Sequence, residues 1–155
     1  MGYFMDPYSG GLFSKNPYAR HSAIKGRIVV VLDAHLTDRE LHLIQPISRA
    51  VKRNDIHELI ATREKGACPG AAVNEVWYIA FFEVTEGGVI VVGDEVLVGG
   101  RSIGCVVGFD DTHLPNHQNI ILRTEANKTG LELEIGLGEP VLIGEKGSVS
   151  ERTQL

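Results

Sequence analysis

Short apolar runs separated by glycine turns fill the second half of the chain. Residues 76–84 are rich in aromatic and β-branched side chains, and Gly87-Gly88 separates them from a second run over 89–92. The later runs follow the same pattern, over residues 95–98, 102–109, 119–124, 131–135 and 140–144. This pattern predicts strands joined by hairpins. Many short strands at such spacing are typical of a closed barrel or a sandwich, in which few strand edges stay exposed.

The first half of the chain has a different pattern. Residues 24–33 are β-branched and mostly apolar, which predicts a strand in the core. Thr37 followed by Glu40 forms a capping-box pattern, and the apolar residues after it recur at helical spacing. The spacing predicts a helix from about 38 to 53, bent or broken before Pro46.

Residues 55–62 also start with an acidic side chain and fit a helix or a strand, of which we expect the helix. Together with the preceding segment they predict a helical insertion over about 37–62. Aromatic side chains interleave with glycine, proline and serine over residues 1–22, so we expect an irregular arm that packs either on its own domain or on a second copy of the chain. We expect a single barrel domain over 23–146 and a flexible tail over 147–155.

Composition excludes several classes of partner. The 155 residues fit one domain, with 43% hydrophobic and 23% charged residues and a net charge of -5, which argues against nucleic acid bound through its phosphates. The apolar runs are far shorter than the ~20 residues of a membrane helix, so no membrane partner is expected. Cys68 and Cys105 have no paired spacing, as a reducing compartment permits. The chain is therefore predicted to be cytoplasmic and of a bacterial type.

The loop over residues 110–119 is the candidate functional site, because two carboxylates, two imidazoles and three carboxamides are crowded into it. His113 and His117 are four residues apart, a spacing at which a helix presents both rings to one metal. Pro115 between them disfavours a helix, so chelation would need a loop conformation. With Asp110 or Asp111 as a third ligand, and His35 or His42 from the predicted helical region as a fourth, these residues are candidates for a zinc or iron site. His113, His117 and Asp111 are also candidates for acid–base catalysis without metal.

The alternative for this loop is purely structural. Its aspartates would then begin turns, its asparagines would bond the backbone, and its histidines would be solvated. A second polar group surrounds the predicted helix start and includes His35 and His42. If the two groups converge, a pocket forms between them. The ligand-binding candidates are then His35, His42, Asp110, Asp111, His113, Asn116 and His117.

Residues 65–145 resemble the glucitol/sorbitol-specific enzyme IIA family of the bacterial sugar phosphotransferase system. Residues 66–69, Gly-Ala-Cys-Pro, are similar to that family's Gly-Ala-Pro loop with one residue inserted, and residues 92–100 resemble its central glycine hairpin. Residues 107–109, a polar loop with Asn119, and residues 120–122 are similar to its later strand, loop and strand. The resemblance implies a small closed Greek-key barrel. We therefore predict an α+β, mainly β fold, a Greek-key-like barrel with an N-terminal strand and a helical insertion.

The chain departs from that family at the residue that carries its chemistry. The family transfers a phosphoryl group through a histidine whose position falls near residues 79–81, and no histidine lies between His57 and His113. We therefore expect a non-phosphorylating ligand-binding or accessory protein of bacterial small-molecule metabolism, assembled as a homo-oligomer and without a cofactor unless zinc or iron is bound. The alternatives are a small enzyme that uses the 110–119 loop and a phosphocarrier with a displaced histidine.

Overall fold

The structure, a computed structural model, describes residues 22–147. Within this range the chain forms twelve β-strands and no helix. The strands are β1 (Ile24–Val31), β2 (His35–Leu36), β3 (Leu41–His42), β4 (Ser48–Val51), β5 (Ile56–Thr62), β6 (Ala72–Val73), β7 (Val76–Glu86), β8 (Gly88–Val91), β9 (Glu95–Val98), β10 (Arg101–Asp110), β11 (Asn119–Arg123) and β12 (Pro140–Gly144). The predicted arm over 1–22 and the predicted tail over 147–155 lie outside the described residues, apart from one residue each.

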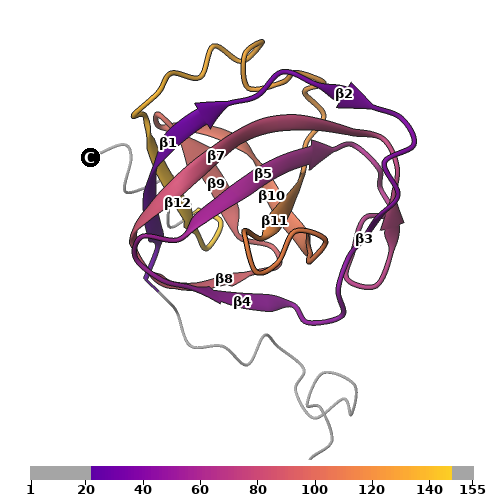
Figure 1. The fold of residues 1–155 in the computed structure, drawn as a ribbon, viewed down its shortest axis with the longest axis horizontal. Helices are drawn as coiled ribbons and strands as arrows, with labels where there is room; N and C mark the ends of the chain where they lie inside the picture. Colours follow the sequence, from indigo (N-terminus) through magenta and orange to yellow (C-terminus); the bar gives the residue numbers. More distant parts are fainter. Residues whose placement is uncertain (1–21, 148–155) are drawn as a thin grey trace, which may run out of the picture.

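Eight of the strands form one strongly curved sheet in the order β1-β12-β9-β10-β11-β5-β7-β2 (Figure 1). β1 pairs with β12 on one side and with β7 on the other, so the sheet curls around a core. β11 and β5 pair in parallel, and the other neighbours in the sheet are antiparallel. Two separate two-stranded sheets, β3–β6 and β4–β8, complete the fold. Figure 1 shows β4 and β8 side by side along the lower end of the curled sheet.

The curled sheet encloses the larger apolar cluster, in which Trp77, Phe82 and Phe109 are fully buried. Successive side chains of a strand point to opposite faces. Leu59 on β5 accordingly belongs to this inner cluster, whereas its neighbour Ile60 packs in a second cluster with residues of β3 and β6. The strand β5 is therefore covered on both faces, and its residues from position 57 onward are all buried.

The predicted helical insertion over 37–62 is wrong, because this segment forms β3, β4 and β5. Glu40, the second residue of the apparent capping box, has a φ of 53°, a left-handed conformation that a right-handed helix does not contain. Pro46 lies between β3 and β4 and removes a helical hydrogen bond donor. Of the apolar residues that recur at helical spacing, Leu41 is buried in β3 and Val51 in β4, whereas Ile44 and Ile47 lie between these two strands and are partly buried.

The predicted α+β class and closed Greek-key-like barrel with a helical insertion are therefore corrected to an all-β arrangement of one curled eight-stranded sheet and two two-stranded sheets. The mainly β character is confirmed. Seven of the strands expected from the apolar runs are present with slightly different bounds, as β1, β7, β8, β9, β10, β11 and β12. The strand expected over 131–135 is wrong, because residues 131–134 form turns and Ile135 lies outside any strand.

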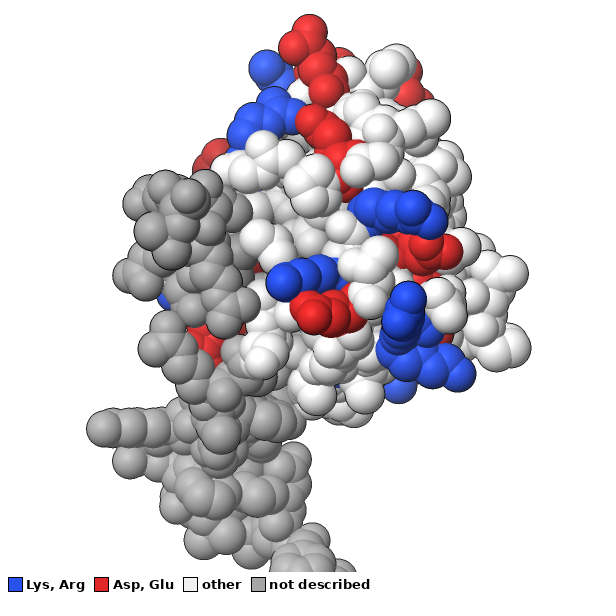
Figure 2. Space-filling model, turned by 90° about the vertical axis from the view of Figure 1, so that its left-hand side faces the viewer, with Lys and Arg blue, Asp and Glu red and all other residues white. Residues whose placement is uncertain are grey.

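Charged side chains of both signs are mixed on the surface. On the face shown in Figure 2, Lys and Arg side chains lie beside Asp and Glu side chains and do not merge into one broad basic patch. Oppositely charged side chains also form surface ion pairs, such as Arg27–Glu83 at 2.8 Å. In the described part of the chain, no helix has the length and apolar character needed to cross a membrane.

Candidate functional site

Asp110, the last residue of β10, anchors the 110–119 loop. Its buried carboxylate accepts hydrogen bonds from the backbone N–H of Thr112 at 2.9 Å, from Nδ2 of Asn119 at 3.1 Å and from the backbone N–H of His42 at 3.3 Å. Burial by itself raises the pKa of Asp110, but these hydrogen bonds outweigh it and hold the pKa below its ordinary value. Asp110 therefore closes the loop and fixes its position against the segment that contains β3.

A second set of bonds ties the loop to β4. Nε2 of Gln118 donates to the backbone carbonyl of Asp110 at 2.7 Å and to Oδ1 of Asp111 at 2.6 Å. Nη2 of Arg49, on β4, donates to Oδ2 of Asp111 at 2.5 Å. Both oxygens of Asp111 are thus engaged, and the carboxylate positions the loop over β4.

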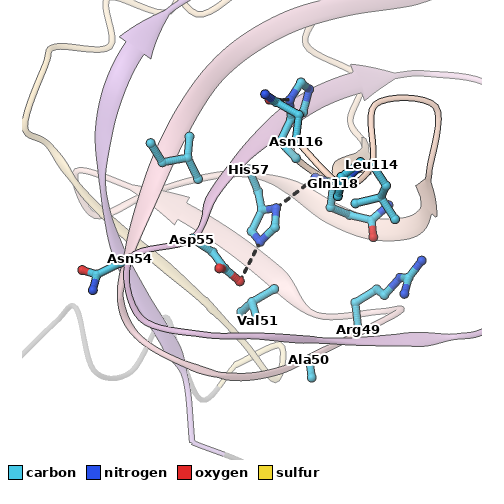
Figure 3. Close-up of a pocket in the computed structure, with 12 residues that line it drawn as sticks. Arg49, Ala50, Val51, Asn54, Asp55, His57, Leu114, Asn116 and Gln118 are labelled. Carbon is cyan, nitrogen blue, oxygen red and sulfur yellow. Dashed lines mark hydrogen bonds and ion pairs between the residues drawn. The ribbon is translucent and has the colours of Figure 1, made fainter.

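A cavity of about 450 Å³ lies between β4, the turn before β5 and the 110–119 loop (Figure 3). Its wall combines charged and amide side chains with apolar ones: Arg49, Ala50, Val51, Asn54, Asp55, Ile56, His57, Leu114, Pro115, Asn116, His117 and Gln118. This volume and this mixture of side chains are typical of small-molecule sites. The lining residues include no serine, threonine or cysteine, so the wall offers no hydroxyl or thiol nucleophile.

His57 forms the buried back of this cavity. The backbone N–H of Gln118 donates to Nδ1 of His57 at 3.0 Å, so the proton of the neutral ring lies on Nε2. Nε2 in turn faces Oδ2 of Asp55 at 3.4 Å (Figure 3). Burial lowers the pKa of His57 below its ordinary value, although Asp55 opposes this. Both ring nitrogens are occupied, and His57 links the turn before β5 to the loop.

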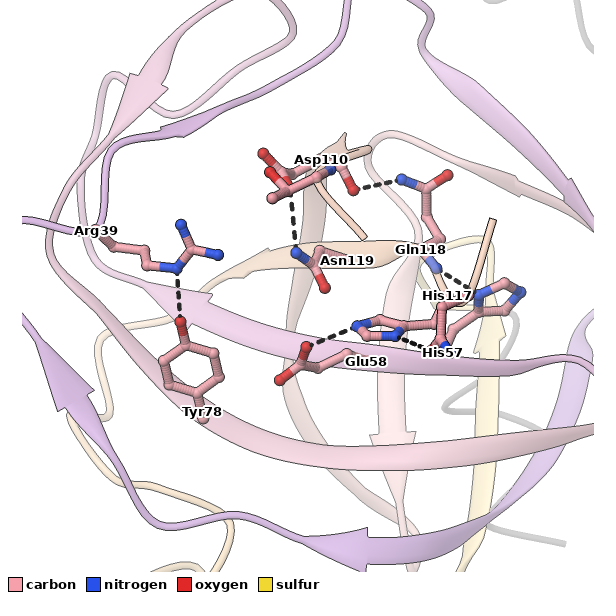
Figure 4. Close-up of polar contacts among 10 residues, drawn as sticks. Arg39, His57, Glu58, Tyr78, Asp110, His117, Gln118 and Asn119 are labelled. Atoms are coloured by element: carbon pink, nitrogen blue, oxygen red, sulfur yellow. Dashed lines mark hydrogen bonds and ion pairs between the residues drawn. The ribbon is translucent and has the colours of Figure 1, made fainter. Parts of the chain in front are cut away.

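Glu58 lies on the opposite face of β5, beneath the loop. Its Oε1 is 3.1 Å from Nε2 of His117, and the two side chains are only 8% and 12% exposed (Figure 4). Burial raises the pKa of Glu58 to about 7, although the charges of His113 and Arg39 oppose this. Burial also lowers the pKa of His117, against an interaction with the side chain of Asn119. The carboxyl and the imidazole therefore form a contact that changes its protonation near neutral pH.

Aromatic rings hold His117 in this position. Its ring stacks on that of His113 with centroids 5.0 Å apart, and the ring of Phe81 on β7 packs edge-on at the same distance. Nδ1 of His117 is 2.8 Å from Oδ1 of Asn116, which lines the cavity. Arg39 reaches over the same face from the segment between β2 and β3 and donates from Nε to the hydroxyl of Tyr78 at 2.9 Å.

A family model described as a family of unknown function, DUF6917, matches residues 18–144. The chain belongs to this family. The match covers all the strands and every residue of the cavity wall. No curated protein and no solved structure matches the chain.

The structure brings some of the predicted site residues of this DUF6917 chain together and separates others. His113 and His117 are in contact, and Asn116 and His117 line the cavity. Asp110 and Asp111 are engaged in holding the loop, and His42 contributes its backbone N–H. His35 lies apart, 44% exposed, with Nε2 at 3.0 Å from Oε1 of Glu132. Among the described residues, no group of three or more His, Cys, Asp and Glu side chains is arranged to hold a metal ion.

Sequence reasoning missed four residues of this region: Arg49, Asp55, His57 and Glu58. Arg49 and Asp55 lie in the segment mistaken for helix, where neither has a distinctive neighbour in sequence. His57 and Glu58 did carry a signal, because they are polar residues at the head of an apolar run of a buried strand. Buried ionisable residues in such a position are rarely without a partner.

Proposed function

We propose that this protein binds a small polar molecule in the cavity between β4, the turn before β5 and the 110–119 loop, without transferring a phosphoryl group. The observation that carries the proposal is the cavity itself, about 450 Å³ in volume and lined by both ionisable and apolar side chains. Such a wall orients a ligand through a few polar contacts and gains affinity from the apolar ones.

Arg49 supports a ligand that carries an oxygen acceptor. Its Nε is buried and has no hydrogen-bond partner among the described residues, while its Nη2 is bound to Asp111. The Arg49 side chain as a whole is 33% exposed, so the accessible part of its guanidinium can donate a charge-assisted hydrogen bond to a ligand oxygen. Asp55 and Asn116 offer further polar groups elsewhere in the wall.

The side chains of the cavity wall also favour binding over covalent transfer. Covalent transfer needs an activated nucleophile, and the lining residues supply no hydroxyl or thiol. The two imidazoles of the wall are engaged at both ring nitrogens, His57 by Gln118 and Asp55 and His117 by Asn116 and Glu58. On β7, where the resembling phosphocarriers have their histidine, this chain has Ile79, Ala80 and Phe81.

A ligand screen tests the binding proposal. Polyols, hydroxycarboxylic acids and amino acids are added to the full chain, stabilisation is measured by thermal unfolding, and any hit is titrated by calorimetry. We expect one class to bind, and Arg49→Met to weaken it at least tenfold. The matched control is Arg63→Met, which removes an arginine of another ion pair, with Glu75 at 2.6 Å. No binding from any class, or equal binding to both variants, would contradict the proposal.

Acid–base catalysis is a second candidate function, and the contact between Glu58 and His117 favours it. A carboxyl group with a pKa near 7 beside an imidazole is a suitable acid–base pair at neutral pH. Any compound that binds is incubated in D₂O, and loss of its C–H signals is followed by NMR. Exchange with the wild-type chain that Glu58→Gln abolishes would support an enzyme.

The expectation that His113, His117 and Asp111 bind zinc or iron gains no support from the geometry, because Arg49 and Gln118 engage both oxygens of Asp111, and Glu58 and Asn116 engage both ring nitrogens of His117. Elemental analysis of the purified chain tests it, and a stoichiometric metal that is lost on replacing both histidines by alanine would support it. The phosphocarrier alternative is tested separately with the general phosphotransferase proteins and labelled phosphoenolpyruvate, and an unlabelled chain would exclude it.

The proposal includes a bacterial cytoplasmic setting, which the two free cysteines, Cys68 and Cys105, support.

A further inference from the structure

Three side chains form a continuous hydrogen-bonded path from the covered face of β5 to the cavity wall. Oε1 of Glu58 is 3.1 Å from Nε2 of His117, and Nδ1 of the same ring is 2.8 Å from Oδ1 of Asn116. Glu58 lies under the loop (Figure 4), whereas Asn116 borders the cavity (Figure 3). The path therefore connects a buried carboxyl group to the ligand cavity through one imidazole.

The donors and acceptors along this path determine where its protons lie. The Oδ1 atom of Asn116 is an acceptor only, so Nδ1 of His117 must carry a proton and donate it. If His117 is neutral, its Nε2 has a lone pair, and Glu58 must be protonated to donate to it. If His117 is charged, Nε2 donates to the Glu58 carboxylate. In either case the 3.1 Å contact contains one proton, and the pair as a whole is neutral.

The surroundings of Glu58 favour keeping this proton. The groups that face it are His113 and His117 from the loop, Arg39 from the segment between β2 and β3, and the uncharged ring of Phe81 from β7. Arg39 and His113 favour the carboxylate, but burial has the larger effect and raises the pKa of Glu58 to about 7. The contact between Glu58 and His117 therefore keeps its proton below about pH 7 and loses it at higher pH.

The surroundings of His117 prevent its ring from moving when the protonation of the Glu58–His117 contact changes. Phe81 and His113 pack on its ring, Asn119 contacts it from β11, and His57 disfavours a second positive charge nearby. The ring of His117 is therefore held in place. When the Glu58–His117 contact loses a proton, the ring changes its tautomer and keeps its position.

Removal of the proton from the contact between Glu58 and His117 makes the observed arrangement unfavourable. A carboxylate would then face the lone pair of Nε2 at 3.1 Å. If the remaining ring proton moves to Nε2, it donates to the carboxylate, but Nδ1 becomes an acceptor and faces Oδ1 of Asn116 at 2.8 Å. A half-turn of the carboxamide places Nδ2 there as a donor and resolves the conflict.

We propose that Glu58, His117 and Asn116 form a proton relay that ends in the cavity wall, in which loss of one proton from the Glu58–His117 contact switches the His117 tautomer and turns the Asn116 carboxamide. The amide oxygen and nitrogen at the edge of the cavity then exchange places. The consequence for a ligand rests on the proposed binding function: the same cavity presents different hydrogen-bonding groups below and above neutral pH.

The relay is tested on the ligand-free full chain by NMR between pH 5.5 and 8.5. Long-range ¹H–¹⁵N spectra report the His117 tautomer, and the side-chain ¹⁵NH₂ signals report Asn116. We expect a change from the Nδ1–H to the Nε2–H form with a midpoint near 7, with the Asn116 signals moving at the same midpoint. In Glu58→Gln the neutral amide donates to Nε2 at every pH, so His117 stays in the Nδ1–H form and Asn116 does not move.

Glu132→Gln is the matched control, since Glu132 contacts His35 at a similar distance, 3.0 Å, but on the surface. It should leave the changes at His117 and Asn116 intact. A single His117 tautomer over the whole pH range in the wild-type chain would overturn the relay, as would an Asn116 signal that stays still while His117 changes. The wild-type titration decides this even if a variant folds poorly, and a failure to find a cavity ligand does not affect it.

Discussion

Glu58 and Asn119 lie directly beside each other in the parallel ladder between β5 and β11. Parallel strands begin at the same edge of a sheet, so the segments that lead into them also meet there. The segment before β5 contains Asp55, and the segment before β11 is the 110–119 loop. The parallel pairing therefore explains why residues about 60 positions apart in the chain form one cavity and one proton relay.

Replacing Glu58 by glutamine should stabilise the protein at alkaline pH. Its pKa rises from 4.5 to about 7 on folding, so the unfolded chain loses the proton first as pH rises, and the free energy of unfolding falls between these values. Above pH 7 the ionised Glu58 lowers the free energy of unfolding by about 3 kcal/mol, and the neutral amide of glutamine avoids this loss. Urea unfolding should show a gain of this order at pH 8 and no gain at pH 4. A loss of stability at pH 8 would contradict this account.

Replacing Asp110 by asparagine should destabilise the protein with the opposite pH dependence. The native carboxylate accepts three N–H groups, and its lowered pKa makes this contribution complete above the ordinary value of 3.8 and lost as pH falls below it. We expect a loss of about 2–3 kcal/mol at pH 7 that shrinks toward pH 3. Asp111→Asn, at a carboxylate that is 36% exposed, should cost less than 1 kcal/mol at pH 7.

Arg49→Met should loosen the 110–119 loop while changing global stability little. The ion pair with Asp111 is about one-third exposed at each partner, so its loss should cost only about 0.5–1 kcal/mol. Because this pair ties the loop to β4, hydrogen exchange at the backbone amides of residues 112–114, 116 and 117 should become faster, whereas exchange in β10 and β11 should not. Unchanged exchange in the loop would show that Gln118 and Asp110 hold it without Arg49.

Gly130→Ala should destabilise the fold strongly. A Cβ atom at this position would overlap the backbone carbonyl of Ile79 on β7, which cannot move without disturbing the sheet. The expected loss is about 3 kcal/mol or more in urea unfolding. Gly66→Ala is the matched control, since a Cβ there meets nothing within 4 Å. It should be neutral or add a few tenths of a kcal/mol, because alanine restricts the unfolded chain.

Local pattern was sufficient to predict the strands from β7 to β12, because glycine turns or polar loops separate them and their apolar residues pack on the core. It failed between Thr37 and Thr62, where the decisive interactions are distant in sequence. β4 is fixed by pairing with β8, and β5 is covered on both faces, so it lacks the alternation that marks a strand. The left-handed conformation of Glu40 is invisible to a pattern that scores only residue type.

The candidate site was predicted in part for the same reason. The 110–119 loop is contiguous, so its polar residues could be recognised together, and His117 does line the cavity. Glu58 and Arg49 reach the loop only through the parallel ladder and the position of β4, and no periodicity in the sequence encodes those contacts. The polar pair His57-Glu58 inside a buried run was the available signal.

The strand β5 acts as a partition between two polar compartments. His57 faces the cavity and its neighbour Glu58 faces the covered side under the loop, so consecutive residues supply different chemistry to the two sides. A slip of one residue would place a carboxylate in the cavity and an imidazole beneath the loop. In the turn before β5, Asp55 accepts a hydrogen bond from the backbone N–H of Lys52 at 2.9 Å. This turn therefore fixes the register of β5, and with it which side chain faces the cavity and which faces the loop.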